Sequence, residues 1–330
     1  MPLNIWTGMH WCSPVLPENS RRSMTLLQKA DRWATVIIIL PGGDSGARDA
    51  MDKVMSITPP YIGLSQCVAR LYTTTAPGFT DFAGAQSWIG QYTSDLNYFV
   101  ARGGRNVVPF NEPDVEHLPP NQLDPRTLGL ISQALRNAYW NGGGSNRLLF
   151  TLFPGPSARA AIQPNDWNAF WDTYEMRLNG VARTFDQRYG SVDPQLAGKY
   201  MLWHGGQGVF DRVALHCYAD SPGEYANSNP AGNKALYQIQ AMLGVDSSGW
   251  IYVTETSGAD PQPNGFDEAA AGSALADFQY NANSLYSPTL QAVYGYALAV
   301  SNAQATSEYR HLIDCEFVEA YVARRLALGF

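Results

Sequence analysis

The chain has 330 residues, of which 45% are hydrophobic and 15% charged, and its formal net charge is −7 at pH 7. This length and apolar content allow a large core, whereas the negative charge and the lack of any Lys/Arg-rich run argue against a nucleic-acid partner. Aromatic residues make up 12% of the chain, with 9 Trp and 18 Tyr. They either fill the core or line a cleft that binds ring-shaped ligands such as sugars.

The cysteines and the apolar runs exclude further classes. Cys12, Cys67, Cys217 and Cys315 form no Cys-x-x-Cys or Cys/His cluster, so we expect no metal site. Cys67 and Cys217 lie in apolar runs and are expected to be buried, while pairing of the other two stays open. No apolar run is long enough to span a membrane. The first residues do not resemble a signal peptide, so we expect a cytoplasmic protein, or a secreted one if a signal has been removed.

Strand-like runs recur along the chain. They are Leu3–Trp11, Ala34–Leu40, Cys67–Tyr72, the run that leads into Asn111-Glu112-Pro113, Arg147–Leu152, Asp211–Tyr218, Trp250–Gly258 and Gln291–Ala297. Helical segments are predicted between and after them, over Leu26–Trp33, Ala47–Ile57, Asp81–Arg102, Leu123–Tyr139, Asn165–Tyr189, Asn233–Leu243, Glu268–Leu285 and Ser307–Leu328.

The strands are almost continuously apolar, which is typical of a parallel sheet covered by helices. Eight strand–helix pairs are the number that closes a (β/α)8 TIM barrel. An open doubly wound sheet is the rival architecture, but no Gly-x-Gly-x-x-Gly or Walker sequence follows an early strand. We therefore predict a single α/β barrel domain over residues 1–330, and we read the glycine-rich segment 41–46 as a turn.

Two of the predicted strands end in glutamate. Glu112 ends the fourth strand, where Pro113 biases the backbone toward extended geometry, and Glu255 ends the seventh. In a barrel of this type the carboxyl ends of the strands form the active site, so both carboxylates should reach one cleft. Cleavage of a glycosidic bond needs such a pair, one protonated and one ionised.

Other strand ends supply candidates for substrate binding. Asn111 is placed to hydrogen-bond a sugar hydroxyl, and Arg70 and Tyr218 to hold Glu255 ionised and oriented, because a positive charge and hydroxyl donors stabilise a carboxylate. The remaining candidates, chosen by position, are His10, Trp11, His216 and Tyr296. Each has a structural alternative: either glutamate could form a rim salt bridge, and His216 could be a hydrogen-bonded core histidine.

The order of these motifs resembles the clan A glycoside hydrolases, which are (β/α)8 retaining enzymes. That group carries Asn-Glu-Pro on strand four, often His-x-Tyr on strand six, and a nucleophilic Glu on strand seven, matching Asn111-Glu112-Pro113, His216-Cys217-Tyr218 and Glu255. The resemblance implies Glu112 as acid/base and Glu255 as nucleophile. This chain departs from the group at strand eight, where it has tyrosines instead of Trp, and at strand two, where the usual Arg is missing and Arg70 on strand three is the nearest substitute.

We expect a retaining β-glycosidase that acts within a polysaccharide chain, uses no cofactor and is a monomer. The segment 153–210, with Trp167, Trp171 and Trp203, could supply aromatic platforms along a groove. A barrel that binds carbohydrate without turnover, or serves as structure, is the alternative from another class, although the presence of both glutamates argues against it. Transfer to an acceptor other than water would use the same two residues.

Overall fold

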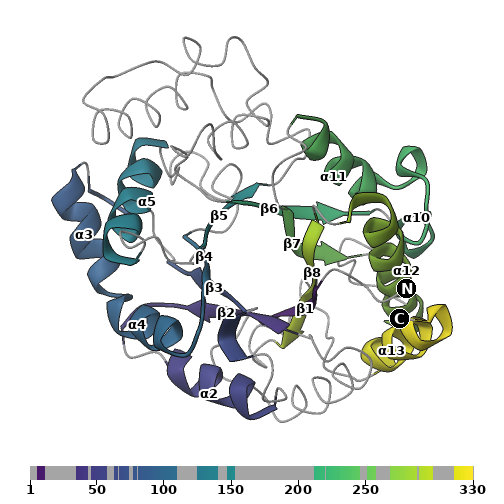
Figure 1. Ribbon diagram of the computed structural model, residues 1–330, viewed down its shortest axis with the longest axis horizontal. Coiled ribbons are helices and arrows are strands. Elements are labelled where there is room, and N and C mark those ends of the chain that lie inside the picture. The colour runs from purple at the N-terminus through teal and green to yellow at the C-terminus, as the bar shows by residue number, and fades with distance from the viewer. Residues whose placement is uncertain are drawn as a thin grey trace.

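In the computed structural model, eight parallel strands close into a barrel in sequence order, and helices surround it (Figure 1). Strands β1 and β8 pair and complete the ring. The predicted TIM barrel is therefore confirmed. The structure describes residues 6–11, 35–43, 46–57, 63–65, 67–73, 77–79, 81–109, 125–139, 147–152, 212–219, 221–245, 251–257, 268–287, 290–299 and 316–329.

The strands fall within or close to the predicted runs. They are β1 (Trp6–Trp11), β2 (Thr35–Leu40), β3 (Val68–Leu71), β4 (Asn106–Val108), β5 (Arg147–Leu152), β6 (Arg212–Tyr218), β7 (Ile251–Ser257) and β8 (Leu290–Ala299). The described helices are α2 (Ala47–Ile57), α3 (Phe82–Gly90), α4 (Thr93–Ala101), α5 (Pro125–Tyr139), α10 (Pro222–Tyr225), α11 (Lys234–Val245), α12 (Glu268–Tyr286) and α13 (Glu316–Leu328), with short 3₁₀ turns at Gly63–Ser65 and Pro230–Gly232. The predicted helices Leu26–Trp33 and Asn165–Tyr189 lie outside the described residues.

Two hydrophobic cores follow from the alternation of side chains along each strand. A small inner cluster consists of strand residues alone, one from each of five strands: Ile37, Val68, Val108, Ala214 and Tyr252. A large outer cluster joins the opposite faces of the same strands to the helices, and it includes Ala69, Leu71, Leu215 and Val253. The membership of each cluster therefore shows which side chains face the barrel interior.

The predicted helical segment Asp81–Arg102 is helical, but it forms two helices, α3 and α4, with a break at Gln91 and Tyr92 that the sequence did not indicate. Asp81 begins α3, and its carboxylate accepts from the Gly84 backbone N–H at 2.7 Å. At the break, the Gln91 carbonyl accepts from the Gly43 N–H at 3.0 Å, and the buried Tyr92 hydroxyl donates to the Tyr72 carbonyl at 2.8 Å. Gln91 and Tyr92 therefore make hydrogen bonds to the residues that follow β2 and β3 at the point where the helix is interrupted.

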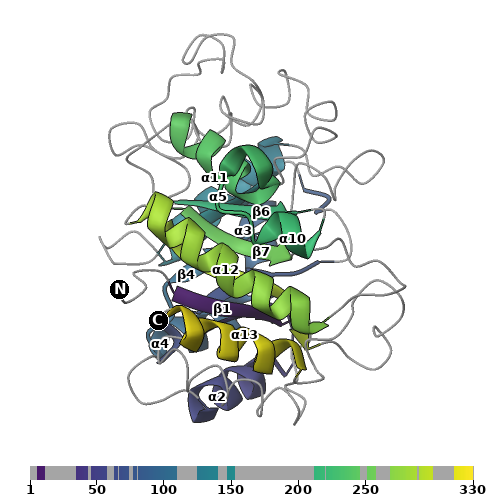
Figure 2. The same cartoon turned by 90° about the vertical axis from the view of Figure 1, so that its right-hand side faces the viewer.

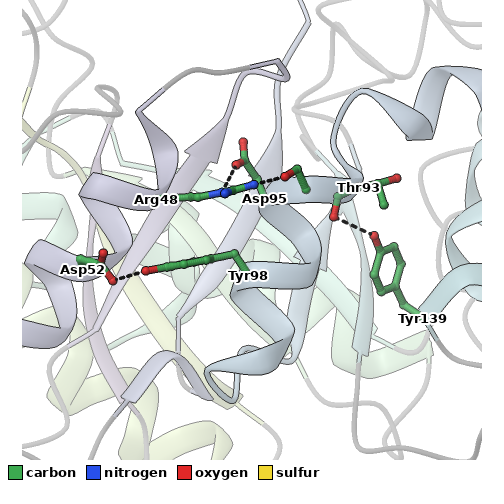
Figure 3. A network of polar contacts seen from close by, with 7 residues as sticks. Arg48, Asp52, Thr93, Asp95, Tyr98 and Tyr139 are labelled. Carbon is green, nitrogen blue, oxygen red and sulfur yellow. Dashed lines mark hydrogen bonds and ion pairs between the residues drawn. The ribbon is translucent and has the colours of Figure 1, made fainter.

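Polar contacts fix α4 against the neighbouring helices (Figure 3). The Tyr98 hydroxyl on α4 donates to Asp52 on α2 at 2.5 Å, and Arg48 on α2 lies 3.3 Å from the buried Asp95 carboxylate. At the start of α4, the Tyr139 hydroxyl on α5 donates to the Thr93 carbonyl at 3.4 Å. The segment that supports the ends of β2 and β3 is therefore held by α2 and α5.

Gly42, just after β2, offers a test of this junction. Its φ is +80°, and an added Cβ would lie 3.2 Å from Cε1 of Tyr92, whereas at Gly43, with φ +69°, a Cβ would meet nothing within 4 Å. We expect Gly42→Ala to lower the free energy of unfolding by about 2–3 kcal/mol and Gly43→Ala by about 1–2 kcal/mol, because the second substitution carries only the backbone cost. Denaturant unfolding of both variants checks this, and equal losses would show that the Tyr92 contact is not restrictive.

On the other side of the barrel, α12 and α13 lie side by side over the strands (Figure 2). Their interface buries a chain of hydrogen bonds in which Arg325 donates to the Tyr321 hydroxyl at 2.8 Å and Tyr321 donates to Gln279. At its exposed edge, Arg324 and Asp277 form an ion pair at 2.8 Å. Among the described helices, none is long and apolar enough to cross a membrane.

Candidate active site

A buried ion pair crosses the barrel interior near the carboxyl ends of the strands. Nη1 of Arg70 on β3 donates to Oε1 of Glu255 on β7 at 2.6 Å, and the Glu255 residue is only 4% exposed. β3 and β7 are four positions apart in a ring of eight, so the two side chains meet from opposite walls. A buried carboxylate is costly unless it is paired, and the guanidinium of Arg70 supplies that partner.

His216 engages the second oxygen of the same carboxylate. His216 lies on β6, the strand next to β7, and is paired in register with Glu255. Its Nδ1 lies 3.3 Å from Oε2 of Glu255. Each carboxylate oxygen therefore has its own protein partner, which fixes both the position and the rotation of the group.

A β-bulge in β7 points Glu255 into the barrel. In β6 one residue step separates Leu215 from His216, but in β7 two steps separate their partners Val253 and Glu255, so Thr254 is the additional residue. The pairing with β8 shows the same extra residue between Val253 and Thr256. With strict alternation from the inward Tyr252, Glu255 would face outward; the bulge reverses this.

The residue after Glu255 anchors the bulged strand to the helix layer. Thr256 is buried, and its hydroxyl lies 2.7 Å from the hydroxyl of Tyr225 on α10, within hydrogen-bond distance. The Tyr225 ring stacks on Phe278 of α12, with centroids 4.4 Å apart. Burial raises the pKa of Tyr225 well above its ordinary value, so the phenol stays protonated and able to donate. Thr256 outward and Glu255 inward together define the orientation of this strand end.

The structure describes some of the predicted site residues in full and others in part. Arg70, His216 and Glu255 come together as one cluster. His10 and Trp11 lie in β1, Tyr218 lies in β6 in register with Ser257, and Tyr296 lies in β8, each described by backbone position alone. Glu112 and Asn111 fall outside the described residues, although β4, which precedes them, runs parallel to β3 and β5.

Two structural features were missed by sequence reasoning. The bulge at Thr254 carries no Gly or Pro that would have marked it, so no sequence signal was available. Tyr72 is an exposed aromatic residue two positions after Arg70. Its spacing was a usable signal, because residues i and i+2 of a strand share one face.

Cys67 and Cys217 are buried, as predicted, and neither forms a disulfide. Burial raises the pKa of the Cys217 thiol far above its ordinary value, which disfavours the nucleophilic thiolate. Among the described residues, no group of three or more His, Cys, Asp or Glu side chains is arranged to hold a metal ion.

Comparison with solved structures extends over almost the whole chain. A β-glucosidase from Thermotoga maritima matches with a TM-score of 0.54 and 11% identity over 98% of both chains. A rice β-glucosidase matches with a TM-score of 0.57 and 10% identity, also over 98% of both chains. A family 39 glycoside hydrolase from Bacteroides cellulosilyticus matches with a TM-score of 0.59 and 14% identity, over 99% of this chain and 64% of that one.

The chain has the fold of the clan A glycoside hydrolases. By sequence, no known family and no curated protein matches it. At identities of 10–14% the likeness concerns the fold alone, so the roles of individual residues depend on the geometry of this chain. In this barrel, the Arg70–Glu255–His216 cluster lies near the carboxyl ends of the strands, which is the end of a (β/α)8 barrel where active sites form.

Proposed function

We propose that this chain, as one catalytic domain over residues 1–330, is a retaining β-glycoside hydrolase with Glu255 as nucleophile and Glu112 as acid/base. The observation that carries the proposal is the inward-facing Glu255 carboxylate, paired with the Arg70 guanidinium at 2.6 Å and with the His216 imidazole at 3.3 Å. A nucleophile must be deprotonated before the substrate arrives and must point at the reacting carbon. This arrangement supports both requirements.

The proposed reaction has two displacements. In the first, a Glu255 oxygen bonds to the anomeric carbon while the glycosidic C–O bond breaks, and Glu112 gives its proton to the leaving oxygen. In the second, the Glu112 carboxylate takes a proton from water, the water oxygen bonds to the anomeric carbon, and the bond to Glu255 breaks. The two inversions at that carbon give net retention, and Glu112 ends protonated as it began.

For the substrate we propose a neutral β-linked polysaccharide cleaved within the chain. The net charge of −7 and the aromatic content of 12% support a neutral substrate, and the two β-glucosidases of the same fold support a β-linkage. Asn111, His10, Trp11, Tyr218 and Tyr296 are proposed to contact the sugar from the ends of their strands. If the viscosity of a polysaccharide solution falls before short sugars are released, this would support cleavage at internal bonds of the polysaccharide.

Trapping of the covalent intermediate tests the proposed nucleophile directly. A 2,4-dinitrophenyl 2-deoxy-2-fluoro-β-glycoside of the sugar that is cleaved should inactivate the protein and add one fluoroglycosyl group, located by peptide mass spectrometry on Glu255. Glu255→Gln should take up no label. Label on another residue, or inversion of the anomeric configuration seen by NMR during turnover, would overturn the assignment.

Two other activities are compatible with the same fold. Transfer to a sugar acceptor uses the same intermediate, and it would appear as longer products when acceptor is added. A barrel that binds carbohydrate without turnover would take up no label from the fluoroglycoside yet bind oligosaccharide. Product analysis and binding measurements on the same protein separate the three.

A further inference from the structure

Tyr72 directly follows β3 at the carboxyl end of the barrel strands. Its backbone N–H donates to the Leu40 carbonyl at 3.0 Å, so the hydrogen-bond ladder between β2 and β3 continues through this residue. Val68 belongs to the inner cluster and Arg70 reaches inward to Glu255. The alternation of the strand therefore places Tyr72 on the same face, about 7 Å beyond Arg70 toward the carboxyl end.

The environment of Tyr72 differs sharply from that of Arg70. Arg70 is 8% exposed, whereas Tyr72, one residue after the end of β3, is 44% exposed. An aromatic ring that remains accessible at the mouth of a barrel offers a flat apolar face beside a polar site, which is the composition of a ligand-binding wall. Pyranose rings have apolar C–H faces that pack on such a surface.

The backbone that carries this ring is fixed before any ligand binds. The Tyr72 carbonyl accepts from the buried Tyr92 hydroxyl at 2.8 Å, and burial raises the pKa of Tyr92, so this phenol stays a donor. The Tyr92 ring in turn packs against Trp88, with centroids 4.8 Å apart. A ring on a fixed backbone loses less conformational freedom on binding than one on a mobile loop.

We propose that Tyr72 is an aromatic platform that binds a sugar unit next to the one attacked by Glu255. The inference rests on the proposed glycosidase function and deepens it. Tyr72 stands one inward position beyond Arg70, which is the partner of the Glu255 carboxylate, so its ring contacts a neighbouring unit of a neutral β-linked oligosaccharide. It discriminates among substrates by length and takes no part in bond cleavage.

Kinetics with substrates of two lengths test the platform. The probes are cellotetraose, xylotetraose and laminaritetraose, each compared with the β-glycosyl fluoride of the same sugar, which has one sugar unit and no neighbour. For the tetrasaccharide that is cleaved, Tyr72→Ala should raise KM about tenfold and change kcat by less than about twofold. For the fluoride, kcat/KM should stay within about twofold of wild type.

Matched variants isolate the ring. Tyr72→Phe keeps the aromatic face and should retain the wild-type KM. Tyr280→Ala removes a tyrosine of similar exposure, 41%, from α12. Tyr280 lies about 18 Å along the helix from its first residue, Glu268, and its loss should leave KM and kcat unchanged. An equal loss on tetrasaccharide and fluoride, or an unchanged KM on the tetrasaccharide, would overturn the platform while leaving the hydrolase proposal intact.

Binding separates this inference from the proposed function. If the wild type cleaves none of the probes, calorimetric titration with the same tetrasaccharides takes the place of kinetics. Binding that is about tenfold weaker in Tyr72→Ala and unchanged in Tyr280→Ala would support the platform and refute hydrolysis. A wild type that neither cleaves nor binds any probe would refute both.

Discussion

Glu255→Gln is expected to lower kcat on the cleaved β-glycoside by about 10⁴-fold or more, because an amide cannot act as the nucleophile. The fold should persist, since glutamine has the same shape and its carbonyl oxygen can still accept from Arg70. Steady-state kinetics and circular dichroism on the same preparation check both parts. Retention of activity within about tenfold of wild type would show that the nucleophile is another residue.

Two comparisons make this experiment specific. Glu112→Gln should lower kcat by about 10²–10⁴-fold, and less for substrates whose leaving group needs no proton, as expected of a general acid. Glu319→Gln changes an exposed glutamate of α13 in the same way and should have no effect on turnover. A loss in Glu112→Gln that is independent of the leaving group would contradict its role in protonation.

Arg70→Met is expected to lower the free energy of unfolding by about 3–5 kcal/mol, because it leaves the Glu255 carboxylate buried without its cationic partner. The 2.6 Å contact joins two buried side chains in the barrel interior, so loss of the guanidinium leaves the carboxylate largely shielded from solvent. Activity should fall as well, since an unpaired buried carboxylate gains a proton and ceases to be a nucleophile. Denaturant unfolding and kinetics measure the two effects.

A double-mutant cycle distinguishes the ion pair from simple loss of packing. Arg70→Met combined with Glu255→Gln should be more stable than Arg70→Met alone, because the second change removes the unpaired charge. Arg324→Met breaks the ion pair with Asp277 at the helix surface, where the Arg324 side chain is 43% exposed, and should cost no more than about 1 kcal/mol. Additive effects at Arg70 and Glu255 would mean that the pair contributes no coupling.

Much of the architecture was predictable from periodicity and composition. Continuous apolar strands that alternate with helical segments indicated eight parallel strands, and a barrel is the closed form of such a sheet. The α2 helix was predicted at its observed bounds, Ala47–Ile57. The candidate site was predictable as a location, since strand carboxyl ends meet at one edge whatever the loops do. Arg70, His216 and Glu255 were all named on that basis.

The sequence could not provide the direction of side chains or the ends of helices where contacts with other elements override the local pattern. Simple alternation from Tyr252 directs Glu255 outward, and only pairing with β6 and β8 reveals the bulge at Thr254 that turns it inward. Likewise, helical periodicity continued across Gln91 and Tyr92, whereas contacts with the ends of β2 and β3 divided the segment into α3 and α4. Local propensity determines which elements form, but these details depend on hydrogen bonds between residues far apart in the chain, which exist only after the barrel has closed.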